Sequence, residues 1–203
     1  KLYRWYVNPE VTQEIETNVI IPLANFFKSP SNNFQIEPVL RRLLTSDVFF
    51  DIANRGAMIK SPMELVIGAY RLFNLPVPFP AAEPLGAEKY LGAVWWAMQS
   101  MQMGVLAQPS VFGYEPYYLA TRSRGWLSSA MLALRYQFAD SLVWPWLQLT
   151  PTYKLGLDLV AWASGLQPQF ANVSGSPAIT TEQVLDSFSQ QLFVFPLSQA
   201  QRD

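Results

Sequence analysis

Apolar residues recur every three or four positions along most of the chain, which is the spacing of one face of an α-helix. The first such stripe comprises Ile15, Val19, Leu23 and Phe26. Pro22 falls within that helix and is expected to bend it. Similar stripes predict helices over residues 36–44, 62–74, 91–101, 127–142 and 182–192, and a weaker one over 153–166. No stretch alternates apolar and polar residues convincingly, so we predict an all-α fold with little or no β-structure.

One helix start stands out, at Ser61-Pro62-Met63-Glu64. A serine at the N-cap accepts a hydrogen bond from the backbone, and a glutamate three residues later returns one. Proline suits the first helical position, because its missing N–H would have no partner there. We therefore interpret Ser61, Pro62 and Glu64 as structural residues that begin a helix.

Two proline- and aromatic-rich loops interrupt the helices of this irregular bundle. Residues 75–85 carry four prolines and are the best candidate for an internal boundary within a single helical domain spanning residues 1–203. From Gly104 to about Arg124 the helical spacing is lost. This second loop contains Phe112 and three tyrosines. Long loops of this kind often carry function.

The chain is poor in charge. Of its 203 residues 50% are hydrophobic and only 14% are charged, where about a quarter is usual for a soluble domain. Either uncharged polar residues cover the surface, or part of it packs against the rest of a longer chain. We expect the chain to be a portion of a larger protein, because its first five residues have the pattern of a helix interior. The net charge of −1 with scattered cations argues against nucleic acid as a partner.

The absence of histidine and cysteine limits the chemistry that this chain can perform. It excludes Ser-His-Asp and Cys-His catalysis, and the usual zinc sites, within these residues. Fifteen carboxylates remain, but no spacing singles out a pair for glycosidic hydrolysis. We therefore predict no catalytic, metal-binding or cofactor-binding residues in this chain.

Aromatic residues are the remaining candidates for binding. The favoured interpretation of the tryptophans is that Trp95, Trp96, Trp126, Trp144 and Trp162 fill the helical core. Side chains of the second loop would instead be exposed, and could stack on sugar rings or anchor a protein partner. The candidate binding residues are Tyr114, Tyr117, Tyr118 and Trp126.

Arg135 lies beside an apolar stripe, between Met131 and Phe138. A buried arginine is costly unless it is paired. We predict an internal ion pair with Glu64, the alternative being a side chain whose charged end reaches water.

The longest uncharged stretch lies between Lys89 and Glu115. It is long enough to cross a bilayer, but it contains three glutamines and Pro109. Amides are costly in lipid and proline breaks a helix, so we predict no transmembrane span.

Four stretches of the chain carry a family resemblance. They are LYRWYV at residues 2–7, PVLRRLLTS at 38–46, KSPMELVI at 60–67, and residues 101–114 continuing to Trp126 and RYQF at 135–138. They are similar to the C-terminal half of the bacterial family known as domain of unknown function 1800. The chain departs from the family pattern at Tyr114, where tryptophan is usual, and at Ser110, where a second proline is usual.

This resemblance implies a large bacterial protein that is exported to the periplasm, the cell surface or the medium. It also implies an upstream half of the same polypeptide, which holds the family's histidine-bearing stretches. Three interpretations remain open: a helical structural or binding portion without catalysis of its own, part of a polysaccharide-acting or other hydrolase completed by the upstream half, and a glycan-binding module. The first predicts a broad exposed apolar face, the second facing carboxylates in a pocket, and the third coplanar exposed aromatics.

Overall fold

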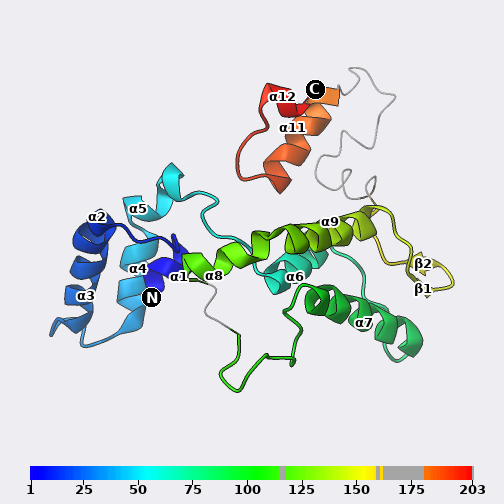
Figure 1. Ribbon diagram of the computed structural model, residues 1–203, viewed down its shortest axis with the longest axis horizontal. Coiled ribbons are helices and arrows are strands. Elements are labelled where there is room, and N and C mark those ends of the chain that lie inside the picture. Colours follow the sequence, from blue (N-terminus) through cyan, green and yellow to red (C-terminus); the bar gives the residue numbers. More distant parts are fainter. Residues whose placement is uncertain (115–117, 159–160, 162–180, 203) are drawn as a thin grey trace. The chain divides into compact units, whose positions relative to one another are not determined.

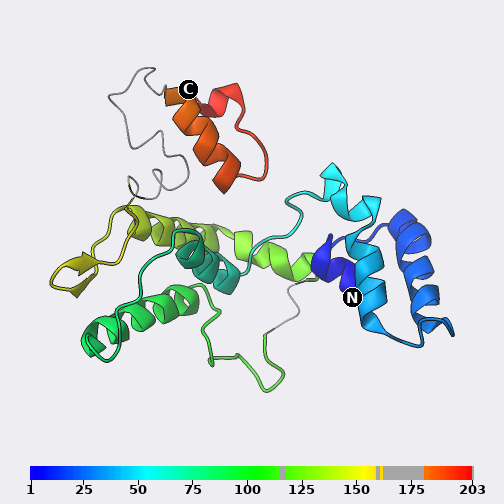
Figure 2. The ribbon, with the colours of Figure 1, turned by 180° about the vertical axis from the view of Figure 1, so that it is seen from behind.

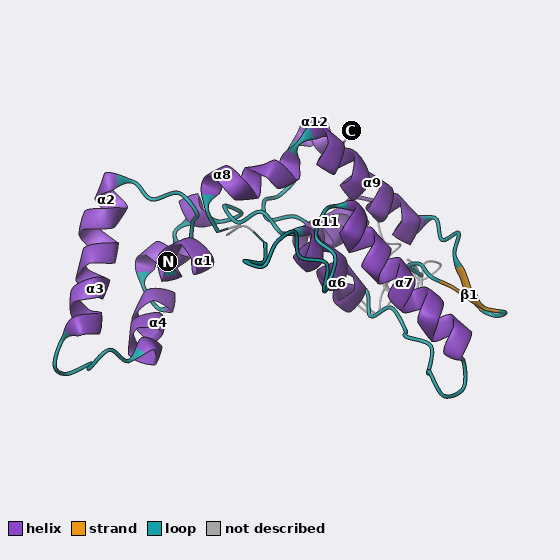
Figure 3. Ribbon diagram, turned by 60° about the horizontal axis from the view of Figure 1, so that its bottom comes forward, coloured by secondary structure: helices purple, strands orange, loops and turns teal. Residues whose placement is uncertain are grey.

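The computed structural model describes residues 1–114, 118–158, 161 and 181–202 of the chain. Helices, purple in Figure 3, account for 58% of it and strands for 3%. The prediction of a predominantly helical fold is confirmed. Two compact units make up the chain: one comprises residues 1–65 and 98–134, and the other comprises residues 66–97 and 135–203.

The first unit begins with a group of short helices in its N-terminal half (Figure 1). They are α1 (Leu2–Tyr6), α2 (Gln13–Ile15), the π-helical turn η1 (Glu16–Ile20), α3 (Ile21–Lys28), α4 (Ile36–Leu44), α5 (Asp47–Phe50) and the 3₁₀ turn η2 (Ile52–Asn54). Thr12 caps α2 by accepting from the backbone N–H of Ile15. Pro22 lies in the first turn of α3, directly after η1, where a missing N–H is tolerated.

α3 and α4 lie side by side, as Figures 1 and 2 both show. The loop between them reverses direction through Asn33 and Phe34, which both have positive φ angles of 46° and 59°. Asn32 stabilises this loop, because its buried side-chain amide donates to the backbone oxygens of Phe27 and Gln35. The core beneath these helices consists of the buried side chains of Tyr3, Val7 and Leu43, with partly buried apolar residues around them.

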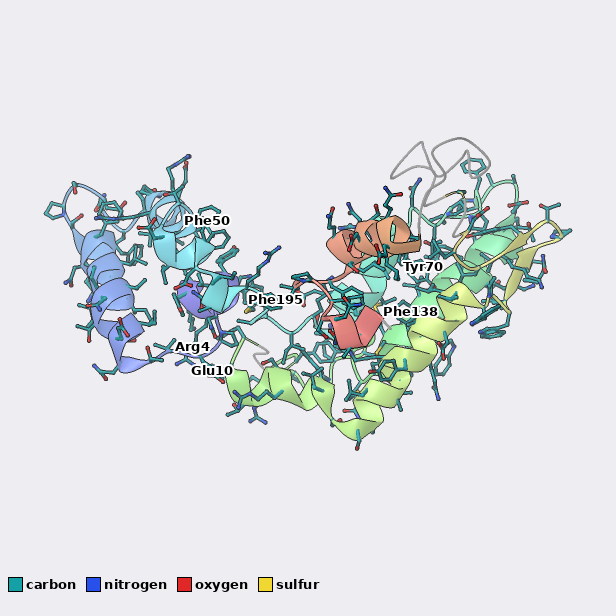
Figure 4. All side chains as sticks on the ribbon, turned by 90° about the horizontal axis from the view of Figure 1, so that it is seen from above. Arg4, Glu10, Phe50, Tyr70, Phe138 and Phe195 are labelled. Atoms are coloured by element: carbon teal, nitrogen blue, oxygen red, sulfur yellow. The ribbon has the colours of Figure 1, made fainter. Side chains whose placement is uncertain are left out.

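Three longer helices follow: α6 (Pro62–Leu72), α7 (Pro84–Ser100) and α9 (Ser129–Val143). In the second unit their core centres on the ring of Tyr70. Its centroid lies 5.4 Å from that of Tyr90 on α7 and 6.2 Å from that of Phe138 on α9. Tyr70 and Phe138 are labelled in Figure 4. Pro145 comes shortly after the end of α9, as expected of a residue that cannot continue a helix.

A two-stranded antiparallel sheet follows α9, formed by β1 (Gln148–Thr150) and β2 (Tyr153–Lys154). Leu149 and Thr150 are buried, and the Nζ of Lys89 donates to the backbone oxygen of Gln148 at 3.3 Å. Beyond this sheet, α11 (Thr181–Leu192) and α12 (Gln199–Arg202) lie in the C-terminal part of the chain.

Two predicted elements need correction. The helix expected over residues 153–166 is wrong at its start, because residues 153–154 form β2; residues 159–160 and 162–166 lie outside the described part. The loop expected up to residue 124 also ends earlier. The short helix α8 (Ala120–Ser123) and the 3₁₀ turn η3 (Arg124–Leu127) occupy its last part. Residues 75–85 lie within the second unit, and the single domain over residues 1–203 stays a prediction.

Candidate binding site

The start of α6 is a complete capping box. The Oγ of Ser61 accepts from the backbone N–H of Glu64 at 3.2 Å, and Oε2 of Glu64 accepts from the backbone N–H of Ser61 at 2.8 Å. Ser61 and Pro62 are buried, whereas Glu64 is exposed. These contacts satisfy two backbone donors at the end of the helix, so they explain the sequence of this stretch without any ligand.

The loop after α7 is held together by Tyr114. Its hydroxyl lies 2.5 Å from the backbone oxygen of Gly104 and 3.0 Å from that of Ala107, and it donates its single proton to either. Tyr114 and Trp126 are half-buried and line one small cleft of about 260 Å³. Three methionines, Met101, Met103 and Met131, line it as well. Tyr114 therefore has a structural contact of its own within this loop.

Three of the four candidate aromatics lie in the described part of the chain, and two of them, Tyr114 and Trp126, line the cleft described above. Tyr118 packs on Trp5, with the ring centroids 5.6 Å apart and the planes 57° apart. Tyr117 lies outside the described residues. Rings of Trp95 and Trp96 meet at 83°, so this neighbouring pair is also far from coplanar. None of these arrangements is the flat platform on which a sugar ring stacks.

Two tryptophans that were expected in the core lie on the surface instead. The exposed fraction is 65% for Trp96 and 77% for Trp144. Trp95 is half-buried, and Trp162 lies outside the described residues. The core interpretation was therefore wrong for Trp96 on α7 and for Trp144, which directly follows α9, because an apolar side chain alone does not determine which side of the chain faces the core.

A cleft of the first unit, with a volume of about 350 Å³, lies among α1, α4 and the continuous helical segment of η1 and α3. One wall is the helical face formed by Ile20, Leu23, Ala24 and Phe27, at positions i, i+3, i+4 and i+7. The other walls come from Leu2 and Tyr3 on α1 and from Ile36 and Val39 on α4. We call this the α1/α3/α4 cleft.

Two cations, Lys1 and Arg4, also line the α1/α3/α4 cleft, and no carboxylate does. Tyr3 is 4% exposed, and its burial together with the charge of Asp51 raises the pKa of its hydroxyl. The tyrosine therefore stays neutral, and the charge at the cleft comes from Lys1 and Arg4. The sequence predicted the stripe of Ile15, Val19, Leu23 and Phe26. The face that lines the cleft is the neighbouring one, most of whose residues follow those of the stripe by one position, and it was not predicted.

A second cleft, of about 480 Å³, brings three carboxylates together: Glu14, Asp47 and Asp51. Each has a local structural role. Glu14 and Asp47 lie in the first turns of α2 and α5, and Asp51 caps η2 by accepting from the N–H of Ala53 at 2.9 Å. Acidic residues are favoured at such helix ends, and the hydrolase interpretation stays a prediction.

The predicted pair of Arg135 and Glu64 joins residues of different units, and it stays a prediction. Burial lowers the pKa of the Arg135 guanidinium from its usual value, which agrees with the half-buried position of this side chain. The carboxylate of Glu64 is engaged with the N–H of Ser61. The alternative, a side chain whose charged end reaches water, also stays a prediction.

Within the described residues no group of three or more acidic side chains is arranged to hold a metal ion. Among those same residues no helix is both long and apolar enough to cross a membrane. A family model described as "Protein of unknown function (DUF1800)" matches residues 1–203. No curated protein and no solved structure matches the chain.

Proposed function

The chain belongs to the DUF1800 family of proteins of unknown function, and we propose that it is a helical binding portion of an exported bacterial protein, without catalysis of its own. Its partner in this proposal is the upstream half of the same polypeptide. The observation that carries the proposal is the exposure of large apolar side chains on the outer faces of α7 and α9 in the second unit.

On α7 the outer face carries large apolar side chains beside the exposed charges of Glu88 and Lys89. Ala87, Tyr90 and Val94 are buried, and they lie at i, i+3 and i+7. Leu85 and Trp96 are 71% and 65% exposed. At about 100° per residue these two lie within about 20° of each other and on the side opposite the buried face. A helix at the surface of a globular protein usually carries polar residues on its solvent-facing side.

The second half of α9 repeats this arrangement. Phe138 and Leu142 are buried, whereas Tyr136 and Val143 are 69% and 39% exposed. The two exposed residues are seven positions apart, which places them on one side of the helix. The exposed indole of Trp144 directly follows them.

Side chains of this kind favour a protein interface. Each buried aromatic side chain removes about 150–250 Å² of surface from water, and tryptophan and tyrosine are enriched among residues that carry binding energy. The low charge of the chain, 14%, fits a surface that is covered in the whole protein. Export to the periplasm, the cell surface or the medium is part of the proposal, on the basis of the family resemblance.

The test is photo-crosslinking in the full-length protein. A photoreactive phenylalanine analogue replaces Trp96 in one variant and Trp144 in a second. Its matched control replaces Glu88, an exposed residue on the same helix as Trp96. We expect the first two positions to crosslink to peptides of the upstream half, and the control to crosslink much less.

Equal crosslinking at all three positions would contradict the proposal. Reaction of the photoreactive groups at residues 96 and 144 with water alone, without any crosslinked peptide, would contradict it as well. Sedimentation gives an independent measurement. The chain mixed with the separately expressed upstream half is expected to form a one-to-one complex that Trp96→Ser and Trp144→Ser weaken. Two separate species would instead favour a self-sufficient module, and a titration with glycans would then test the third interpretation.

A further inference from the structure

The α1/α3/α4 cleft in the first unit has the size of a small-molecule site. Its volume of about 350 Å³ falls within the range of about 300–1,000 Å³ that is typical of ligand pockets. One turn of an α-helix, roughly 5.4 Å high and 10–12 Å across with its side chains, fills about 400–600 Å³. The cleft is therefore too small to enclose even one helical turn, and a thin, extended ligand suits it better.

The walls of the cleft determine the chemistry of most of that ligand. Eight of the ten lining residues are apolar or aromatic, from Leu2 and Tyr3 to Val39. The stripe supplies the aliphatic side chains of Ile20 and Leu23, the small Ala24 and, at one end, the aromatic ring of Phe27. The ring of Phe34 lies edge-on to that of Phe27, with the centroids 5.4 Å apart, and supports this end. Such walls favour a hydrocarbon chain, which makes no hydrogen bonds.

The charges of the cleft determine the rest of the ligand. Arg4, labelled in Figure 4, is half-buried on α1, and Lys1 precedes it by one turn. Neither side chain has an ion pair within the described part of the chain, and the cleft has no acidic lining residue. Glu37 on α4 directly follows the cleft residue Ile36, but its carboxylate forms an ion pair with Arg41 at 3.0 Å. Two cations next to an apolar cleft are complementary to a single anionic group on an apolar ligand.

We propose that the α1/α3/α4 cleft binds a single-chain fatty acid. The hydrocarbon tail lies against the stripe from Ile20 to Phe27 and against Ile36 and Val39. The carboxylate lies at Arg4, whose planar guanidinium can donate two parallel hydrogen bonds to it, and Lys1 adds a second positive charge. This site is independent of the outer faces of α7 and α9.

Calorimetric titration of the delipidated full-length protein with octanoate, decanoate and dodecanoate tests the proposal. We expect affinity to rise about fourfold for each added methylene group until the cleft is full, as burial of hydrocarbon predicts. The methyl ester of dodecanoate, which has the same tail and no charge, is expected to bind at least about tenfold more weakly than the acid. Absence of binding to all three acids would overturn the proposal.

Variants separate the tail site from the head-group site. Arg4→Gln is expected to remove the preference for the acid over its ester, whereas Arg41→Gln, on the exposed side of α4, keeps it. Ala24→Phe fills the cleft with an apolar ring and is expected to abolish binding, whereas Asn25→Phe, beside it on α3 and outside the cleft, leaves binding unchanged. The far-ultraviolet circular dichroism spectrum establishes that each variant is folded.

Two further results would also overturn the proposal. One is an unchanged affinity in the folded Ala24→Phe variant, because it would place the fatty acid elsewhere. The other is binding to vesicles of phosphatidylglycerol without uptake of free fatty acid, since this would assign Lys1 and Arg4 to a membrane surface.

Discussion

The ring of Tyr70 on α6 is stacked on the ring of Phe138 on α9, with the planes 12° apart and the centroids separated by 6.2 Å. Tyr90 on α7 meets the same tyrosine edge-on, at 86°. Three helices that are far apart in sequence thus join at one aromatic ring. Such ring pairs contribute about 0.5–1.5 kcal/mol beyond the burial of their surface.

Replacement of Phe138 by alanine should therefore destabilise the protein strongly. We expect a loss of about 3–5 kcal/mol in the free energy of unfolding, the range for deletion of a buried phenylalanine. Urea unfolding followed by circular dichroism measures it. Tyr136→Ala, on the exposed side of the same helix, is the matched control and should change the value by less than about 0.5 kcal/mol. Equal losses would show that α9 packs by a different face.

The buried tyrosines should make the protein sensitive to alkali. Burial, and then the neighbouring Tyr90 and Tyr153, raise the pKa of Tyr70, and burial raises those of Tyr90 and Tyr153. The folded state disfavours the phenolate, whereas an unfolded tyrosine titrates near about pH 10. This contribution to stability is complete below that pH and is lost as the pH rises towards the folded pKa values.

Urea unfolding at several pH values between about 8 and 12 measures this effect. In Tyr70→Phe the ring stays and the titrating hydroxyl is removed, so its loss of stability above about pH 10 should be smaller than in the unchanged protein. The same dependence on pH in both proteins would contradict the assignment to Tyr70.

Gly156 is expected to tolerate no side chain. A Cβ at this position would lie 2.3 Å from Cβ and 2.7 Å from Cγ of Pro145, and 3.0 Å from the backbone oxygen of Leu142. The proline ring cannot rotate away, so Gly156→Ala should cost about 1–3 kcal/mol. Gly68→Ala is an informative control, because nothing lies within 4 Å of its Cβ and it is inside α6. There alanine should stabilise by about 0.5–1 kcal/mol. Thermal unfolding of both variants should show opposite shifts.

The capping box at the start of α6 should behave as one unit. Ser61→Ala removes the acceptor for the N–H of Glu64 and should cost about 1 kcal/mol. Glu64→Ala frees the N–H of Ser61. The double variant should lose less than the sum of the two single losses, because each replacement already disturbs the same turn. Glu88→Ala on α7 is the exposed control, and strictly additive losses at residues 61 and 64 would contradict the prediction.

Local signals predicted the long helices well. The capping box at Ser61 predicted the start of α6 at Pro62, where the helix begins, and the stripe through Met131 and Phe138 predicted α9. These signals work because they depend on neighbours within one or two turns.

Features that depend on distant contacts were not predictable in this way. The hairpin at residues 148–154 has strands of only three and two residues, and its backbone meets Lys89 from another part of the chain. The outward positions of Trp96 and Trp144 depend on what covers the other side of their helices. The hydroxyl of Tyr114 is bound by backbone oxygens, which have no pattern in the sequence.

Each unit is assembled from two separate stretches of chain, residues 1–65 with 98–134 and residues 66–97 with 135–203. During synthesis the first unit therefore stays incomplete until residue 134 has left the ribosome, by which time the first stretch of the second unit is already present. Growing chains usually complete an N-terminal domain before the next one begins. Here the order of synthesis couples the folding of the two units. Truncation of the chain at any position therefore removes part of at least one unit.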